Sequence, residues 1–434
     1  MSPALIGILM FALMTVLILV GAPLAISMFF SSIVGFLLLG GWGVLTAQLT
    51  TGIMNVCANY SFAVIPLFMV MGSLCSDTGI GEGTFTAAKK WIGGVHGGLL
   101  DAVVIANMIF GACSGVSAAG NIVFSRIALP ELDKHGYDRG LSLGTITCAG
   151  SLSVLIPPSM PILVFALMTN VSVGNALVAG ISTGILFAAF MLIMLNVIIR
   201  IKPGLVPPKS TEKVTLKEKI TTLKLLLPIL LLFALVVGGS FLGWFPATVG
   251  GAVAFVAVFI YAVCKRMTFK KIWLSIWDGL KGFGNVYFIV IAGTLFGRVI
   301  TMSGLADTVA SFIISLNVTP FVVFLMVILF YMFCGCFMDC LSIIIITVPI
   351  VYPVLTGLGY DPIVLVMLLV FAMEIANLTP PVGLSVFYVA NATGESPTFI
   401  FKNVVVYFIM DLVFVLLFAL VPDIILWLPR LVGY

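Results

Sequence analysis

The sequence predicts an all-α polytopic membrane protein with an inverted-topology repeat, in which each repeat contains one re-entrant hairpin and one broken helix. Three observations lead to this prediction. The chain is very apolar, its helix-breaking residues recur at a constant offset between two halves, and its basic residues gather on one side of the membrane once the crossings are counted.

The composition excludes an ordinary soluble protein. Of 434 residues, 62% are hydrophobic and 8% are charged, whereas soluble domains carry about 25% charged residues. A spanning helix needs about 20 apolar residues, so the chain has room for roughly ten or more spans and leaves no stretch for a separate soluble domain. The net charge of +4 reflects basic residues in the predicted loops, so it indicates topology and not nucleic-acid binding.

One half of the chain matches the other at an offset of 223 to 225 positions. The matched sets contain helix-breaking or rigid-turn residues: Ile156-Pro157-Pro158 with Thr379-Pro380-Pro381, Pro130 with Pro353, Pro23 with Pro246, and Thr78-Gly79-Ile80 with Ser303-Gly304-Leu305. Self-similarity at a fixed period indicates an internal repeat. We therefore divide the chain into a first repeat (1–199), a polar linker (200–223) and a second repeat (224–434).

Both repeats are predicted to contain the same elements in the same order. The first has spans at 4–21, 24–43 and 60–75, a hairpin at 97–112 and 116–129, a broken helix at 140–170 and a span at 176–199. The second has spans at 224–242, 246–264 and 284–302, a hairpin at 320–334 and 338–352, a broken helix at 363–393 and a span at 398–421. The hairpin segments, at about 14 to 16 residues, are too short to cross comfortably, so we expect them to be re-entrant. The first span lacks the features of a signal peptide and is expected to be retained.

The distribution of Lys and Arg supports the inverted arrangement. If each hairpin returns to its own side, each repeat crosses the membrane an odd number of times, and the second repeat is inserted upside down. With the lysine-rich linker in the cytoplasm, almost all other basic residues also become cytoplasmic, as the positive-inside rule requires. We therefore expect a cytoplasmic linker and a periplasmic N-terminus.

Two segments are predicted to lie in the membrane surface as arm helices. Residues 268–282 place Phe269, Trp273 and Trp277 on one face and Lys270 and Lys271 on the other, which is typical of an interfacial helix. Residues 45–59 have the same helical period at the matching place in the first repeat. The alternative is that both segments are tight connectors with no mechanical role.

The proline-rich breaks mark where we expect the chemistry. Pro157, Pro158 and Pro161 in one repeat, and Pro380 and Pro381 in the other, interrupt helical hydrogen bonding within apolar segments. Irregular backbone at membrane depth is tolerated only where protein buries it or where it lines a cavity. Inverted repeats with matching helix breaks are typical of secondary transporters that bind substrate and ions near the midplane. The freed carbonyls suit Na+, and no organic cofactor or other metal is expected.

Two pseudo-symmetric Na+ sites are predicted where the hairpin tips adjoin the breaks. Both tips are rich in small residues, and they carry polar side chains that offer oxygen ligands. The first site comprises Ser114, Ser117, Gly150, Ser153 and Pro157. The second comprises Gly335, Asp339, Asn377, Thr379 and Pro380. Close helix packing is the alternative role of such small and hydroxyl residues.

Acidic residues within apolar segments are further candidates, because intramembrane acids are costly and usually functional. Asp339 and Glu374 adjoin the second break. Asp101 and Asp411 lie elsewhere in apolar segments. The alternative role of these acids is a structural ion pair, for which Arg126 and Arg298 are the candidate partners.

The half-helices that follow the breaks begin after Pro161 and Gly383, and their positive dipole ends can hold an anionic group. The predicted substrate-binding residues are Ser159, Glu374 and Gly383.

An enzyme is not expected from these residues. No His-Glu-x-x-His motif occurs, and His96 and His135 both lie beside predicted loops. The eight Cys fall in apolar segments, where a thiol behaves as a small hydrophobe, so neither a disulfide framework nor a zinc site is predicted. A passive channel is a further alternative, which flux without Na+ dependence would reveal.

The tips and breaks resemble those of the large membrane subunit of the tripartite ATP-independent periplasmic (TRAP) transporters. The matching motifs, in a likeness that covers essentially the whole chain, are Ser114-Gly-x-Ser117, Pro130-Glu131-Leu-x-Lys134-x-Gly136-Tyr137, Ile156-Pro-Pro-Ser159-x-Pro161 and Glu374-x-x-Asn377-Leu-Thr379-Pro-Pro-Val-Gly383. The resemblance implies an elevator-type mechanism, Na+ coupling and a bacterial inner-membrane location. It also implies a periplasmic binding protein that delivers an organic acid anion, of the sialic acid or C4-dicarboxylate class, and a four-helix small membrane subunit, expected to be a separate polypeptide.

The nearest alternative is a stand-alone Na+/carboxylate symporter of related elevator fold, such as the divalent anion/Na+ symporters. Those proteins often carry Ser-Asn-Thr signatures at their hairpin tips. The tips here read Ser-Gly-Val-Ser and Cys-Gly-Cys, which favours the TRAP family.

Overall fold

The computed structural model describes residues 2–208, 214–246, 248–305, 308–309, 311, 318–335, 338–380 and 383–433, and the regular structure of these residues is helical. Pro381, Cys336 and residues 209–213 of the linker lie outside the described residues. The first half contains α1 (Pro3–Leu19), α2 (Leu24–Cys57), α3 (Val64–Asp77), α4 (Ile80–Ile92), α5 (Gly98–Ser114), α6 (Ser117–Lys134), α7 (Arg139–Ala149), α8 (Leu152–Leu155), α9 (Met160–Thr169) and α10 (Val173–Ile201).

The second half repeats much of this order. It contains α11 (Leu216–Phe233), α12 (Gly239–Phe241), α13 (Gly250–Cys264), α14 (Phe269–Met302), α16 (Pro320–Gly335), α17 (Cys340–Gly357), α18 (Pro362–Ala376), α19 (Leu384–Thr393), α20 (Pro397–Leu420) and α21 (Asp423–Leu431). A π-helical turn at Ala234–Gly238 joins α11 to α12, and 3-10 turns occupy Tyr60–Ala63 and Pro203–Leu205.

Equivalent helices begin at equivalent capping residues. The Asp138 carboxylate accepts from a backbone amide at the start of α7, and Asp361, 223 positions later, does the same for α18. Ser172 caps α10, and Ser396 caps α20. Because such caps satisfy amides that have no partner within the helix, the sequence sets the helix starts locally and at the same places in both halves.

Seven helices in the described residues are long and apolar enough to cross a membrane, or eight if the pair α3 and α4, bent by 61°, forms one span. The segment from α7 to α9 is the most enclosed of the candidate spans, since 83% of its apolar window is buried, compared with 22% for α11 and the π-helical turn. The polytopic helical fold is therefore confirmed, and the broken segment lies inside the protein. The predicted hairpins correspond to α5 with α6 and α16 with α17. Because α17 by itself is long enough to cross, re-entry stays a prediction.

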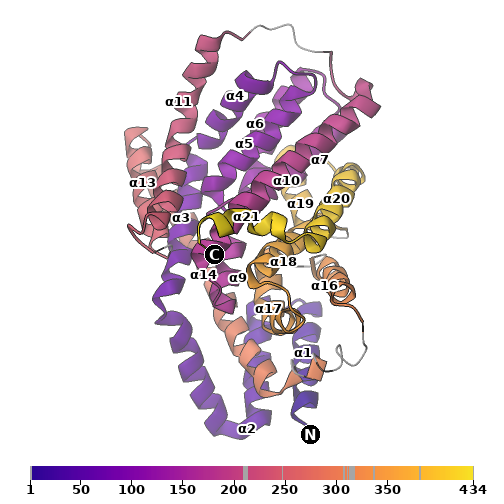
Figure 1. Ribbon diagram of the computed structural model, residues 1–434. Helices are drawn as coiled ribbons and strands as arrows, with labels where there is room; N and C mark the ends of the chain where they lie inside the picture. The colour runs from indigo at the N-terminus through magenta and orange to yellow at the C-terminus, as the bar shows by residue number, and fades with distance from the viewer. Residues whose placement is uncertain are drawn as a thin grey trace.

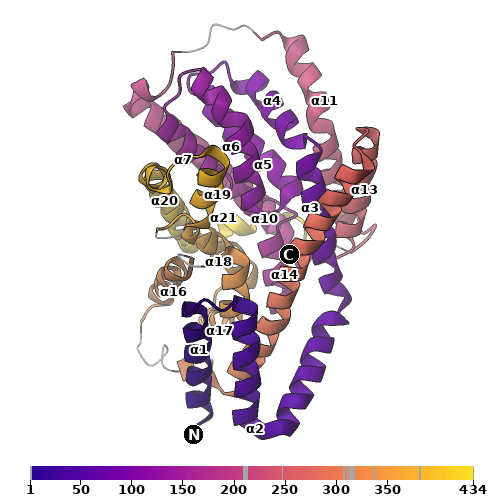
Figure 2. The same cartoon turned by 180° about the vertical axis from the view of Figure 1, so that it is seen from behind.

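The two predicted arm segments join their neighbouring spans differently: a kink separates the first from its span, whereas the second is continuous with its span. Residues 45–57 continue α2 beyond a kink at Gly40 and Gly41, where Gly41 adopts φ +68°, a conformation open to glycine. Residues 269–282 form one uninterrupted 34-residue helix, α14, with the span that follows. No proline removes an amide between these residues and Met302, so the helix propagates. Figures 1 and 2 show both long helices reaching the end of the molecule where α1 lies.

The hairpin and broken helix of each half pack against those of the other half. Helices α6 and α7 of the first half contact α19 of the second, and α9 of the first half contacts α17 and α18 of the second. Aromatic rings fill the centre of this assembly: the ring centroid of Phe187 lies 4.6 Å from that of Phe371 and 5.1 Å from that of Phe414. This interleaving brings both helix breaks into one core, although they are far apart in the sequence.

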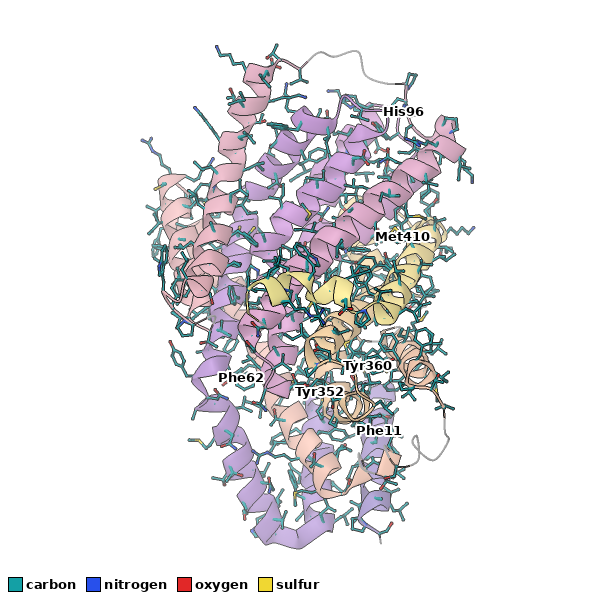
Figure 3. The ribbon with its side chains drawn as sticks, viewed as in Figure 1. Phe11, Phe62, His96, Tyr352, Tyr360 and Met410 are labelled. Atoms are coloured by element: carbon teal, nitrogen blue, oxygen red, sulfur yellow. The ribbon has the colours of Figure 1, made fainter. Side chains whose placement is uncertain are left out.

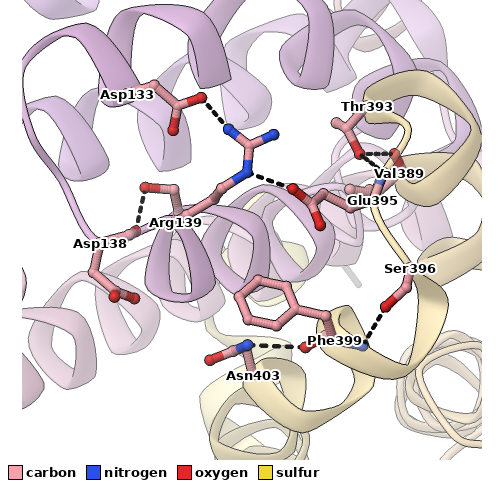
Figure 4. A network of polar contacts seen from close by, with 10 residues as sticks. Asp133, Asp138, Arg139, Val389, Thr393, Glu395, Ser396, Phe399 and Asn403 are labelled. Atoms are coloured by element: carbon pink, nitrogen blue, oxygen red, sulfur yellow. Dashed lines mark hydrogen bonds and ion pairs between the residues drawn. The ribbon is translucent and has the colours of Figure 1, made fainter.

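Charged residues gather at the end of the molecule where α6 joins α7. Arg139 Nε lies 2.6 Å from Glu395 Oε1, and the Arg139 guanidinium also pairs with Asp133 (Figure 4). Lys89 of α4 pairs with Glu131 of α6, and this ammonium holds the pKa of the Glu131 carboxyl below its usual value. Figure 3 shows His96 at the same end, away from Tyr352 and Tyr360.

Candidate ion and substrate site at the helix breaks

The first break separates α8 from α9. Helix α8 ends at Leu155, and α9 begins at Met160 behind Ser159, whose hydroxyl oxygen accepts a hydrogen bond from the Ile162 amide at 3.4 Å. Pro157 and its successor lack amide hydrogens, so α8 cannot continue through them as a helix. The whole stretch is buried. Ser159 is therefore used as a cap at the start of the half-helix where the sequence predicted anion binding.

The tip of the first hairpin touches this break. Gly115 adopts φ +68°, and its carbonyl oxygen accepts a hydrogen bond from the Met160 amide at 3.1 Å. A methyl group on Gly115 would lie 2.3 Å from the Pro158 carbonyl oxygen. Only glycine permits both this conformation and this approach. The structure thus places Ser114, which directly precedes Gly115, beside the first break.

Buried oxygens gather around the first break. Ser114 Oγ and Ser153 Oγ are both buried and have no hydrogen-bond partner in the part of the chain that the structure describes. Leaving a buried hydroxyl unpaired costs about 1–3 kcal/mol. Gly150, at the end of α7, packs so closely on the Asn121 side chain that a methyl group there would overlap the amide at 2.1 Å. Hydroxyls that remain unpaired in this position fit a site that a bound cation completes.

Two residues that the sequence analysis missed also belong to this region. Asn107 Oδ1 lies 2.7 Å, and Ser153 Oγ 3.0 Å, from the point that a methyl group on Gly120 would occupy. Asn107 Oδ1 has no hydrogen-bond partner among the described residues. Asn121, turned so that its amide donates, reaches the Ile146 carbonyl at 3.0 Å. The signal that could have found them is the presence of amide side chains in otherwise apolar hairpin segments.

The tip of the second hairpin approaches the second break by direct backbone contact. A methyl group on Gly335 would lie 2.1 Å from Ala376 Cβ, at the end of α18. Asp339 caps α17: its carboxylate accepts from the Leu341 amide at 3.1 Å, the Ser342 amide at 3.3 Å and the Ser342 hydroxyl. Its oxygens are thus already engaged, and its side chain is only half-buried.

The second break follows Ala376 at the end of α18. The Asn377 carbonyl accepts from the Ser385 amide at 3.2 Å, and Asn377 Oδ1 has no hydrogen-bond partner among the residues described. Thr379 Oγ1 donates to the Ala376 carbonyl at 2.6 Å. Gly383 adopts φ +57°, and a methyl group there would lie 2.7 Å from the Phe401 ring. Pro380 is exposed, unlike the buried Pro157 of the first break.

Glu374 connects the two repeats. It is 1% exposed, and its carboxylate interacts with Asn377, whose Nδ2 donates to Oε2 at 3.4 Å, and with Ser117 of the first hairpin. The other oxygen, Oε1, has no hydrogen-bond partner in the described chain. Ser117 was predicted to belong to the first site, but its side chain meets the acid of the second repeat. The buried carboxyl group of Glu374 therefore lies between residues of the two predicted cation sites.

The other intramembrane acids do not form the arginine pairs that the sequence suggested. Asp101 accepts a hydrogen bond from Asn196 Nδ2 at 3.1 Å. Arg298 instead donates to Gln48 Oε1 at 3.0 Å and to Thr51, while Arg126 is exposed. Asp411 contacts the Cys148 thiol at 3.5 Å. The predicted acid–arginine pairs are therefore wrong. In the folded chain, the side chains of these acids and arginines face other residues.

Comparisons with known proteins show the family to which the chain belongs. The family model of the tripartite ATP-independent periplasmic transporter, DctM component, matches residues 11–424. The chain belongs to this family. It is 31% identical to a C4-dicarboxylate TRAP transporter large permease protein of Pseudomonas aeruginosa, over 86% of this chain and 87% of that protein. It is 26% identical to a sialic acid TRAP transporter large permease protein of Vibrio cholerae, over 96% of this chain and 97% of that protein.

The fold also resembles a solved transporter structure. The YdaH transporter of Alcanivorax borkumensis aligns with a TM-score of 0.67, covering 100% of this chain and 99% of that chain at 14% identity. At this identity the likeness concerns the fold alone. The family prediction is confirmed, and the chain is a multi-pass large permease of the TRAP family whose relatives are transport proteins.

Proposed function

We propose that this chain imports an organic acid anion in symport with Na+, and that a periplasmic binding protein delivers the anion. The observation that carries this proposal is the convergence of hairpin tips and helix breaks around buried oxygens that have no hydrogen-bond partner among the described residues, which include Ser114 Oγ, Ser153 Oγ and Asn377 Oδ1. Hard cations prefer oxygen ligands. A neighbouring carboxylate, Glu374, adds the negative charge that favours cation binding in a buried site.

The residues divide into two cation sites and one anion site. Ser114, Gly150, Ser153 and Pro157 support the first cation site, and Gly335, Asn377, Thr379 and Pro380 support the second. Asp339 supports the second cation site indirectly, by capping α17. Ser117 supports cation binding through its contact with the Glu374 carboxyl group. The anion is expected near the half-helix starts at Ser159 and Gly383, because helix N-termini attract negative charge.

The moving part is proposed to be the interleaved core. Helices α5 to α9 and α16 to α19 pack on one another across the two halves, so they can slide as one body. Helix α14 packs on both α2 and α3, and these helices would form the scaffold. In this arrangement the two repeats are inverted with respect to each other, and their hairpins are re-entrant. The chain lies in a bacterial inner membrane, with the linker on the cytoplasmic side and the N-terminus on the periplasmic side. A separate small membrane subunit would complete the scaffold.

The deciding experiment is uptake of radiolabelled succinate and sialic acid into proteoliposomes that contain this chain and its small subunit. We expect uptake only with both a Na+ gradient and the cognate binding protein, and succinate is the first probe because the dicarboxylate relative is the more similar one. Na+-driven uptake without the binding protein would favour the stand-alone symporter. Uptake that ignores Na+ would refute the coupling.

A further inference from the structure

Two rows of residues face each other where α7 packs on α20. Each row has four-residue spacing, which places its members on one helix face: Asn403, Tyr407 and Asp411 on α20, and Gly140, Gly144 and Cys148 on α7. Methyl groups on Gly140 and Gly144 would overlap the side chains of Asn403 and Tyr407 at 2.3 and 2.7 Å. The small residues of α7 thus make room for a polar row on α20. We call this interface the α7–α20 seam.

The seam leads from a charged end of the molecule to a buried acid. Asn403 is half-buried, near the Arg139 and Glu395 pair (Figure 4). One turn further, the Tyr407 hydroxyl lies 2.6 Å from Thr145 Oγ1 and 3.4 Å from the Leu141 carbonyl oxygen. One turn beyond that is Asp411, which is 0% exposed. Hydroxyl groups thus occupy the interval between the charged end and the carboxyl group.

Among the residues that the structure describes, Asp411 lacks the partners that a buried carboxylate needs. Its contact across the seam is the Cys148 thiol, 3.5 and 3.6 Å from its two oxygens, and a thiol is a weak donor. An ionised carboxylate without compensating partners costs several kcal/mol in a protein interior. Asp101, in the first hairpin, has a partner of a different kind, the Asn196 amide.

The helices packed against α20 bring no cation to Asp411. On α18 the titratable side chain is Glu374, which lies close enough to repel an Asp411 carboxylate; α7 brings Cys148, and on α19 the titratable residue is Tyr388. The basic residues of these helices and of α10 lie elsewhere. Arg139 begins α7, Arg200 lies in the last turn of α10, and Lys402 is exposed near the start of α20.

From this geometry we propose that Asp411 is a proton-binding site that exchanges its proton with water along the α7–α20 seam. In the forward step the carboxylate takes up one proton and becomes a neutral carboxylic acid. In the reverse step the acid releases that proton to water and becomes a carboxylate again. A proton suits this site better than Na+, because Na+ needs several oxygen ligands, whereas the group facing Asp411 from α7 is a thiol. The site is separate from the cation sites at the helix breaks.

Infrared spectroscopy of the full chain in lipid bilayers tests the proposal without any transport assay. We expect a protonated-carboxyl C=O band that disappears in Asp411→Asn, changes amplitude between pH 5 and 9, and shifts in D2O. Asp423→Asn is the control, because this acid is exposed and pairs with Arg430. A spectrum of Asp411→Asn identical to that of the unaltered protein, or a band that neither titrates nor shifts, would overturn the proposal.

A second pair of variants tests the path. Tyr407→Phe removes the hydroxyl midway along the seam, and we expect it to slow the D2O shift of the Asp411 band at least about tenfold. Tyr331→Phe is the matched control, because Tyr331 is also a buried tyrosine bonded to a threonine hydroxyl, that of Thr347, at 3.2 Å. Equal exchange rates in both variants would contradict the path.

Cys148→Ser keeps the site testable if Asp411→Asn fails to fold. A serine hydroxyl donates a stronger hydrogen bond than a thiol, which favours the ionised carboxylate. We therefore expect the band to titrate at lower pH in Cys148→Ser. An unchanged or higher midpoint would show that the thiol does not face the proton site.

Discussion

The first helix break is surrounded by neutral oxygens, whereas a buried carboxylate stands beside the second. At the 223-residue offset, Ser151 occupies the place of Glu374. Both side chains are 1% exposed, and each has an oxygen without a hydrogen-bond partner in the described chain. Similar backbones thus carry different charges, and Ser117 couples them by reaching across to Glu374. If the proposed cation sites are occupied, the acid that both can share comes from the second repeat.

Removing that charge should have the largest effect. Glu374→Gln keeps the shape of the side chain but deletes the buried negative charge, so the Na+ concentration for half-maximal succinate uptake should rise at least about tenfold, equivalent to about 1.4 kcal/mol. Asp101→Asn is the control, because it removes an acid that Asn196 already satisfies. Normal Na+ dependence in Glu374→Gln would show that the two breaks do not share this charge.

The contact between the first tip and its break gives the next prediction. Gly115→Ala should strongly reduce uptake, because the new methyl group would lie 2.3 Å from the Pro158 oxygen and the residue must keep a positive φ. Gly136→Ala is a matched control: its φ is +77°, but nothing lies within 4 Å of the added methyl group. Gly136→Ala should cost about 1–2 kcal/mol of stability from φ alone, with uptake retained. Equal uptake by both variants would argue against a functional tip contact.

Hydroxyl deletions at the two breaks should differ in their effect on stability. Thr379→Ala removes a 2.6 Å hydrogen bond to the Ala376 carbonyl and should cost about 1 kcal/mol. Ser114→Ala removes a buried hydroxyl without a partner among the described residues, so thermal stability in bilayer nanodiscs should stay unchanged or rise. Both variants should weaken the Na+ dependence of uptake. A marked loss of stability in Ser114→Ala would indicate a structural role instead.

The smallest effect is expected outside the core, at the ion pair between Lys89 and Glu131. Lys89→Met should lower the free energy of unfolding by less than about 1 kcal/mol, as for other partly exposed pairs. Because Lys89 lowers the pKa of Glu131, this stabilisation is present above the unfolded-state pKa of about 4.3 and is lost as pH falls through the folded-state value. Thermal unfolding should show a lower stability of Lys89→Met than of the unaltered protein at pH 7, and equal stabilities at pH 3. A difference of equal size at pH 3 would contradict the charge-based explanation.

The positions of the helices and breaks could be predicted because their signals are local. Asp138 and Asp361 cap matching helices, and Pro157 and its neighbour interrupt one of them. The first arm segment follows a kink at Gly40 and Gly41, but the second was predicted apart from its span, because the amphipathic pattern of 268–282 does not reveal whether the helix continues. The structure continues it into α14 through a stretch without proline. Cap and proline signals act within a few residues, whereas continuation depends on what the next turns pack against.

The sequence by itself determined the membrane class, the repeat, the family and the location of both breaks, since composition and proline placement do not depend on distant contacts. The tertiary structure decided which residues meet. It paired Ser117 with Glu374, used Asp339 as a helix cap, and placed Asp411 against Cys148 and not against an arginine. The Asp339 cap is local, but the contacts of Ser117 and of Asp411 join the two halves of the chain. They depend on how the helices of one half pack between those of the other, which no local pattern records.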